Sequence, residues 1–344
     1  MDEHESIHTL SSALSYGLLW DNAVRRRFPD CAVAAIRLIL PPQGEELVRL
    51  RRHGLASTGT LECFRLDPSA GELNPIAWSD GGNPASTLRR ASPNSSLPGS
   101  AGAAILEEIR EFCPQATWEF GLDGKSRARF YGLDILREAS GAEALAAPYC
   151  FGPGREQSPL LPATWPLFRR FLRDLASQRV AGGDRRHSLY ALQPERWMEH
   201  LLRSDPTCLD AHVDPRFVYS QVPVCGHGHR DVLDLLALDR AGRLLVWELK
   251  ADEDLDFPMQ ALDYWLRVRH HQLRGDFPRL GYFPGIAISP LPPRLWLVAP
   301  ALRWHPQTDI LTRWISPAIP WTRFGLNEEW RHGLQIVFRK DAVP

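Results

Sequence analysis

Three residues in one stretch of the chain have the types and spacing to form a metal site, with two carboxylates as ligands and an amine beside them. Asp234, Glu248 and Lys250 lie at the ends of two apolar runs, residues 232–238 and 244–249, which a turn containing Asp and Gly connects. Such runs around such a turn predict a β-hairpin. Side chains alternate along a strand, so Glu248 and Lys250 share a face, and the hairpin brings Asp234 to the same end. We therefore expect two carboxylates and an amine to meet at the edge of an apolar sheet.

Unpaired charge at such an edge is unfavourable. Burying ions costs on the order of several kcal/mol each, and a divalent cation between Asp234 and Glu248 would remove that cost. Lys250 strengthens the pattern, because lysine occurs at only three positions of the chain, 125, 250 and 340. Asp231 is an alternative carboxylate, but Asp234 runs directly into the apolar strand and is preferred.

The elements around the hairpin must position these groups. A helix over 194–203 precedes the hairpin and carries Glu195 and Glu199 on one face. A second amphipathic segment, 254–271, predicts a helix after the hairpin. Apolar runs predict further strands at 217–224, 294–298 and 334–338. The expected order is therefore helix, three strands, helix and strand.

This order and its motifs resemble the PD-(D/E)XK, or restriction-endonuclease-like, nuclease superfamily. The resemblance rests on Asp234 in the second strand and on the Glu-Leu-Lys sequence at 248–250 in the third. Gln260 and Tyr264 match the QxxxY motif that RecB-type members carry on the following helix. The matching region, 190–340, looks most like the NucS/EndoMS mismatch-endonuclease branch. The proline of the superfamily's name is absent, because a leucine precedes the aspartate.

The resemblance implies a deoxyribonuclease that depends on Mg²⁺ or Mn²⁺. The metal would neutralise the phosphate and acidify a bound water. Lys250 would orient or help deprotonate that water and stabilise the developing charge. Glu199, with Glu195 as an open alternative, would hold a ligand water or a second metal. The expected metal ligands are Asp234, Glu248, the backbone carbonyl of Leu249 and Glu199.

The same resemblance implies DNA as the partner. Gln260 and Tyr264 would orient the active-site lysine or contact the DNA backbone. The helix then continues into basic residues that would track phosphates and make the affinity depend on salt. These residues are Arg267, Arg269, His271 and Arg274. Repair, defence and mobile elements all use this fold, so the fold does not choose the pathway.

We expect the chain to divide into three parts. A Pro/Gly-rich connector and an Arg-rich helix at 147–186 separate two regions of ordinary domain size. Residues 187–344 would form the nuclease core, with a mixed central sheet flanked by helices. Residues 1–146 would form an α+β domain that binds substrate or makes a homodimer. The overall fold class is thus mixed α/β (α+β). The N-terminal elements are expected at 11–28, 33–40, 44–53, 61–66, 74–78, 103–112, 117–122 and 127–136, with a mobile loop at 80–102.

Composition limits the remaining possibilities. The apolar fraction of 44% fits a globular protein with a substantial core, and the formal net charge of −1 requires any nucleic-acid surface to be local. No apolar run approaches the roughly 18 residues of a membrane span. The six cysteines form no CxxC pair and no secretory leader is seen, which predicts a cytoplasmic protein with reduced thiols.

Other interpretations of these segments stay open. Cys225, His227 and His229 resemble a metal clip, but three ligands within five residues suit structural zinc poorly, and a Gly-rich loop near the DNA is preferred. The acidic residues at 252–256 are most simply a solvated loop and helix start. The alternative function is a catalytically silent nuclease-like fold that only binds nucleic acid or protein.

Overall fold

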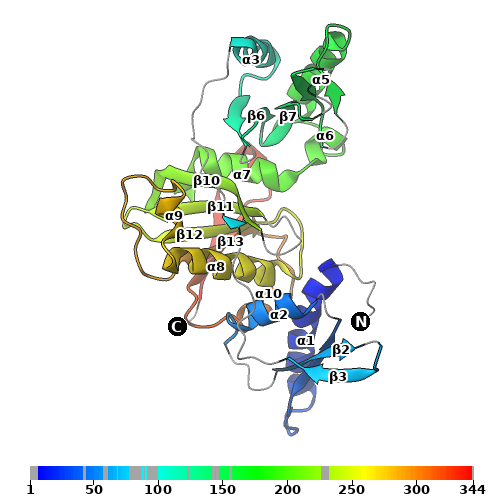
Figure 1. Cartoon of the computed structure of the whole chain (residues 1–344), viewed down its shortest axis with the longest axis vertical. Coiled ribbons are helices and arrows are strands. Elements are labelled where there is room, and N and C mark those ends of the chain that lie inside the picture. Colours follow the sequence, from blue (N-terminus) through cyan, green and yellow to red (C-terminus); the bar gives the residue numbers. More distant parts are fainter. Residues whose placement is uncertain are drawn as a thin grey trace. The chain divides into compact units, whose positions relative to one another are not determined.

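The computed structural model describes residues 7–41, 44–56, 61–67, 69–76, 87–88, 90, 100–121, 124–141, 144, 147–154, 157–225 and 232–342. They form two compact units, and each unit is built from separate segments of the chain (Figure 1). The first unit comprises Met1–Leu88, His212–Leu326 and Ile336–Pro344, and the second comprises Arg89–Ala211 and Asn327–Gln335.

The first unit is organised around a mixed sheet. Its strand order is β15-β14-β13-β12-β11-β10, and the two-residue strand β4 extends the β10 edge. The β12, β13 and β14 strands pair in parallel, and the other neighbours pair antiparallel. This architecture confirms the mixed α/β fold class. The strands are β4 (Thr87–Leu88), β10 (Val213–Cys225), β11 (Val232–Asp239), β12 (Leu244–Leu249), β13 (Arg294–Pro300), β14 (Trp321–Leu326) and β15 (Ile336–Asp341).

The predicted hairpin is confirmed as β11 and β12. They pair antiparallel, with Leu235 opposite Trp247. The turn between them is closed by the Asp239 carboxylate, which accepts two backbone N–H groups, and by Gly242, whose φ of 79° suits glycine. Every residue of β12 is buried, which explains its apolar sequence and makes a charged residue within it costly.

Helices cover the sheet of the first unit. The long helix α8 (Phe257–Leu273) packs against β12 and β13 (Figure 1). It begins three residues later than the sequence predicts, with Asp256 at its N-cap. The short helices α9 (Asp276–Arg279) and α10 (Thr308–Thr312) also pack on α8.

The N-terminal segment belongs to this unit as well. It contains α1 (Ile7–Arg27), α2 (Glu45–Arg52) and a three-stranded sheet of β1 (Ile36–Leu40), β2 (Leu61–Asp67) and β3 (Glu72–Pro75). The fully buried Arg51 of α2 pairs with Asp256 at 3.2 Å and with Asp263 at 2.9 Å. Ser15 of α1 donates a hydrogen bond to the same Asp256. These contacts place the first 88 residues with the hairpin, so the chain does not divide at residue 146.

The second unit contains an antiparallel sheet in the order β5-β6-β7-β8-β9. Helix α5 packs its Phe168 and Leu172 into a core with Phe130 and Ile135 of the sheet. The segment 147–186 therefore supplies a core helix of this unit. The elements are α3 (Ser100–Phe112), β5 (Thr117–Phe120), β6 (Ser126–Phe130), β7 (Leu133–Glu138), β8 (Tyr149–Phe151), β9 (Ser158–Pro159), α5 (Trp165–Gln178), α6 (Ser188–Ala191), α7 (Pro194–Ser204) and the 3₁₀ turns η2 (Pro206–Cys208) and η3 (Trp330–His332).

Two strand predictions are wrong. Residues 127–136 form two strands, because Tyr131 and Gly132 have φ of 44° and 74° and reverse the chain. A Cβ at Gly132 would lie 1.9 Å from the carbonyl oxygen of Arg196, so the turn requires glycine. The sequence analysis also misses β14, where the buried Arg323 interrupts the apolar pattern.

Several sequence predictions fall on residues outside the described ranges. They concern Asp231, the two histidines His227 and His229 of the clip, and most of the 80–102 loop. Within the described part of the chain, no disulfide is formed. None of the helices described there combines the length and apolar character needed to cross a membrane.

Candidate functional site

A row of three polar side chains crosses β10, β11 and β12. The antiparallel register that joins Leu235 to Trp247 places Asp234 opposite Glu248. The register between β10 and β11, with Ser220 opposite Leu235, places Gln221 opposite Asp234. Residues directly opposite on neighbouring strands have Cβ atoms about 4.5–5.5 Å apart. The hairpin therefore brings the two predicted carboxylates together, as the sequence analysis expects, and Gln221 adjoins them.

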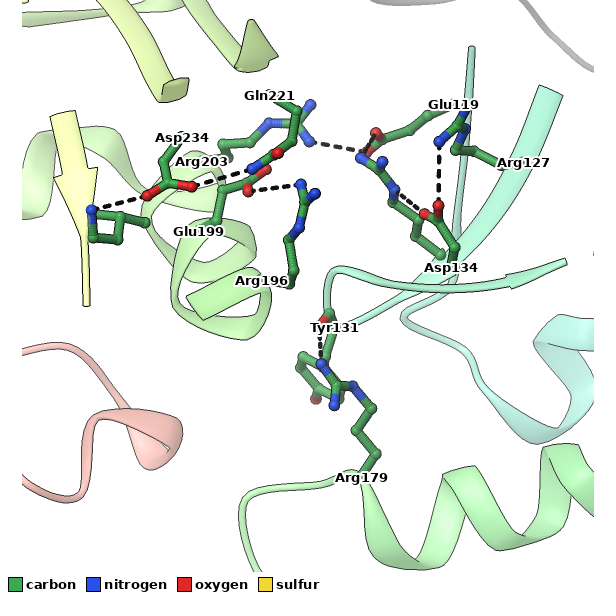
Figure 2. A network of polar contacts seen from close by, with 12 residues as sticks. Glu119, Arg127, Tyr131, Asp134, Arg179, Arg196, Glu199, Arg203, Gln221 and Asp234 are labelled. Atoms are coloured by element: carbon green, nitrogen blue, oxygen red, sulfur yellow. Dashed lines mark hydrogen bonds and ion pairs between the residues drawn. The ribbon is translucent and has the colours of Figure 1, made fainter. Parts of the chain in front are cut away.

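Two hydrogen bonds hold the carboxylate of Asp234. Its Oδ2 accepts the backbone N–H of Leu249 at 2.9 Å, and its Oδ1 accepts the side-chain amide of Gln221 at 3.3 Å (Figure 2). The side chain is half-buried. These two donors fix where the carboxylate oxygens lie.

Glu248 is the most unusual group in the row. It is 3% exposed, and within the described structure its Oε2 is buried without a hydrogen-bond partner. Burial raises the pKa of this carboxyl well above its ordinary value of 4.5, and the nearby Asp234 raises it further, against an opposing effect of Lys250. In the metal-free protein Glu248 therefore tends to hold a proton. A buried oxygen without a partner is the kind of group that a cation can satisfy.

Lys250 follows β12 and lies beside the carboxylates. Its Nζ pairs with Asp254 at 2.9 Å. Burial lowers the pKa of Lys250, but Glu248, Asp254 and Asp234 together outweigh burial, and the pKa lies above its ordinary value. The amine is therefore a cation at neutral pH. Asp254 is thus an ion-pair partner of the site, a role that the solvated-loop interpretation of 252–256 misses.

The QxxxY residues lie on α8. Gln260 is half-buried and Tyr264 is buried, and the helix that carries them packs against β12. Their spacing places both on one face of the helix. The structure thus confirms their helix and leaves a contact with Lys250 or with DNA as a prediction.

The predicted helical acid lies in the second unit. Glu199 of α7 is 3% exposed and pairs with Arg196 at 3.3 Å, whereas Glu195 is half-buried (Figure 2). A network of ion pairs continues in this unit through Glu119, Arg129 and Asp134. Glu199 is therefore held in the second unit, and its reach to the Asp234–Glu248 pair stays a prediction.

The predicted DNA-binding residues of α8 divide into two groups. Arg267 is 8% exposed and donates to the carbonyl of Val224 at 3.3 Å, and His271 is 5% exposed and contacts Asp276 at 2.7 Å. These two side chains are engaged within the protein, and their contact with phosphates stays a prediction. Arg269 is half-buried and donates to the carbonyl of Pro290 at 2.9 Å. Arg274 is exposed and remains a candidate for DNA contact.

The donor set suits a hard cation that keeps part of its water shell. No group of three His, Cys, Asp or Glu side chains that could hold a metal occurs among the described residues. The site therefore offers two carboxylates, with the Leu249 carbonyl as a predicted third oxygen. Mg²⁺ commonly binds through one or two carboxylates and retains several waters. The buried Oε2 of Glu248 fits such an ion.

Comparisons with models of known protein families and with curated proteins find no match to this chain.

Proposed function

We propose that the chain is a divalent-metal-dependent nuclease that hydrolyses phosphodiester bonds of DNA. The observation that carries the proposal is the pair of Asp234 and Glu248, opposite one another on β11 and β12, with a buried Glu248 oxygen that has no hydrogen-bond partner among the described residues. Lys250 adds a cation beside the pair. The resemblance of these residues and of the QxxxY motif to the PD-(D/E)XK pattern supports the same activity.

Each residue has a role that its surroundings support. Asp234 and Glu248 would hold Mg²⁺ or Mn²⁺ together with the Leu249 carbonyl, and the bound ion would neutralise the phosphate and acidify a water. Asp234 is pre-oriented by its two hydrogen bonds. Lys250, which keeps its proton, would stabilise negative charge on the phosphate and orient the attacking water. Asp254 holds the flexible lysine chain in place.

A cleavage assay tests this proposal. Plasmid, single-stranded, branched and mismatched DNA are incubated with Mg²⁺, Mn²⁺ or EDTA. We expect cleavage that needs the metal and that falls at least about 100-fold in Asp234→Ala and in Lys250→Ala, the scale on which single electrostatic groups act. Glu253→Ala, an exposed acid on the same loop, is the matched control. Cleavage that persists unchanged in both site variants would refute the assignment.

A second candidate is a nuclease-like fold that binds nucleic acid without cutting it. Lys250 is paired with Asp254, and the described residues contain no third carboxylate, His or Cys in a metal-binding group. This candidate predicts metal-independent DNA retention in a gel-shift assay, with no product under any ion tested.

A further inference from the structure

The left-handed backbone of Gln221 is the strained feature nearest the candidate site. Gln221 lies within β10, yet its φ is 53°. Pairing is continuous on both sides of it, with Ser220 opposite Leu235 and Val222 opposite Leu233. A residue with a Cβ adopts this conformation only at an energetic cost. Such strain persists only where the surroundings impose it, and it is often found at functional sites.

The strain coincides with a specific contact. The Gln221 amide donates to Oδ1 of Asp234 at 3.3 Å, while the Leu249 N–H fixes Oδ2 at 2.9 Å (Figure 2). Two donors on different strands thus fix the rotation of the carboxylate about its Cβ–Cγ bond. An amide is suited to this role, because it orients a carboxylate without adding a charge that competes for the metal.

We infer that Gln221 is a positioning residue that presents the Asp234 carboxylate to the divalent cation. The inference rests on the proposed function, since it assigns a role at the same metal site. Residues that orient a metal ligand in this way typically change metal affinity or activity by roughly 10- to 100-fold when they are replaced. Gln221 does not touch the reacting atoms in this account and acts only through Asp234.

Glycine and alanine separate this role from a structural one. Gln221→Gly removes the amide and relieves the backbone strain, so the protein should be at least as stable as the wild type. Gln221→Ala removes the amide but keeps the strain. Both variants should lose about 10- to 100-fold in Mn²⁺ affinity, measured by titration calorimetry or by the EPR signal of free Mn²⁺. Ser220→Gly, at the neighbouring position of the strand, controls for added flexibility.

The measurement distinguishes this inference from the proposed function. Wild-type protein that binds Mn²⁺ no more tightly than Asp234→Ala overturns both. Wild-type protein that binds Mn²⁺ tightly, together with Gln221→Gly and Gln221→Ala that bind it equally well, overturns the positioning role alone. Reduced affinity in Gln221→Gly with an undiminished melting temperature supports the inference, because a purely structural residue would lose both or neither.

Discussion

Replacing Glu248 with glutamine should stabilise the metal-free protein and abolish its response to Mg²⁺. The Glu248 carboxyl is buried, its Oε2 has no hydrogen-bond partner in the described structure, and Asp234 lies opposite. Glutamine has nearly the same shape, carries no charge, and can donate its amide toward Asp234. A buried polar group without a partner costs about 1–3 kcal/mol, so the free energy of unfolding should rise by a similar amount.

The gain is measurable as a shift in melting temperature. For a unit of about 150–250 residues, each kcal/mol moves the midpoint by roughly 2–4 °C. In EDTA, we therefore expect Glu248→Gln to melt roughly 2–12 °C above the wild type. Mg²⁺ at about 1,000 times the dissociation constant should reverse the order, because binding then adds about 4.1 kcal/mol to the wild type alone.

Differential scanning calorimetry with EDTA and with Mg²⁺ makes the comparison. Glu253→Gln, at an exposed position of the loop after β12, changes the net charge equally and should melt as the wild type does. A Glu248→Gln protein that is less stable than the wild type in EDTA would contradict the reasoning, because it would mean that the Glu248 carboxylate is satisfied by the protein itself.

Three further predictions follow from other contacts. The pKa of Glu248 is raised in the folded protein, so above pH 4.5 the folded protein holds a proton that the unfolded chain has released. The free energy of unfolding of the metal-free protein should therefore fall as pH rises above 4.5. Urea titrations of Glu248→Gln should lack this pH dependence. Gly132→Ala should lower the melting temperature far more than Gly124→Ala, because both have positive φ but only a Cβ at Gly132 meets a backbone oxygen. Arg51→Met should destabilise the protein by about 3–5 kcal/mol in urea unfolding, since it leaves buried carboxylates unpaired, and adding Asp263→Asn should recover part of the loss.

The sequence was sufficient to place the two carboxylates. The hairpin is symmetric about its turn, so a residue before β11's apolar core and one near the end of β12 must meet, and alternation decides their face. Gln221 could not be found in this way, because it comes from a third strand and sits in a conformation that no strand pattern predicts. The pairing of Lys250 with Asp254 depends on the path of a loop, which composition does not fix.

The burial of side chains on α8 was also hard to predict, because it depends on several packed neighbours. The helix packs against β10, β12 and β13 and also against α2 and α10, so it has no broad polar face. Arginine and histidine are usually exposed, yet Arg267 and His271 are buried here, where they contact Val224 and Asp276. The predicted domain boundary after residue 146 also depends on contacts between residues that are far apart in the chain. The ion pairs of Arg51 with Asp256 and Asp263 join residues more than 200 positions apart in the chain, and no local signal reports them.

Two unfavourable features of the first unit lie in one row of side chains. Gln221 holds a left-handed backbone, Glu248 holds an oxygen without a hydrogen-bond partner among the described residues, and Asp234 lies between them. Strands β11 and β12 are almost wholly buried, so the packing around Glu248 prevents its side chain from relaxing. If a cation binds between the carboxylates, it satisfies Glu248 and uses the orientation that Gln221 gives to Asp234. The proposed metal site therefore accounts for both features with one ligand, whereas a purely structural sheet would gain stability from replacing either residue.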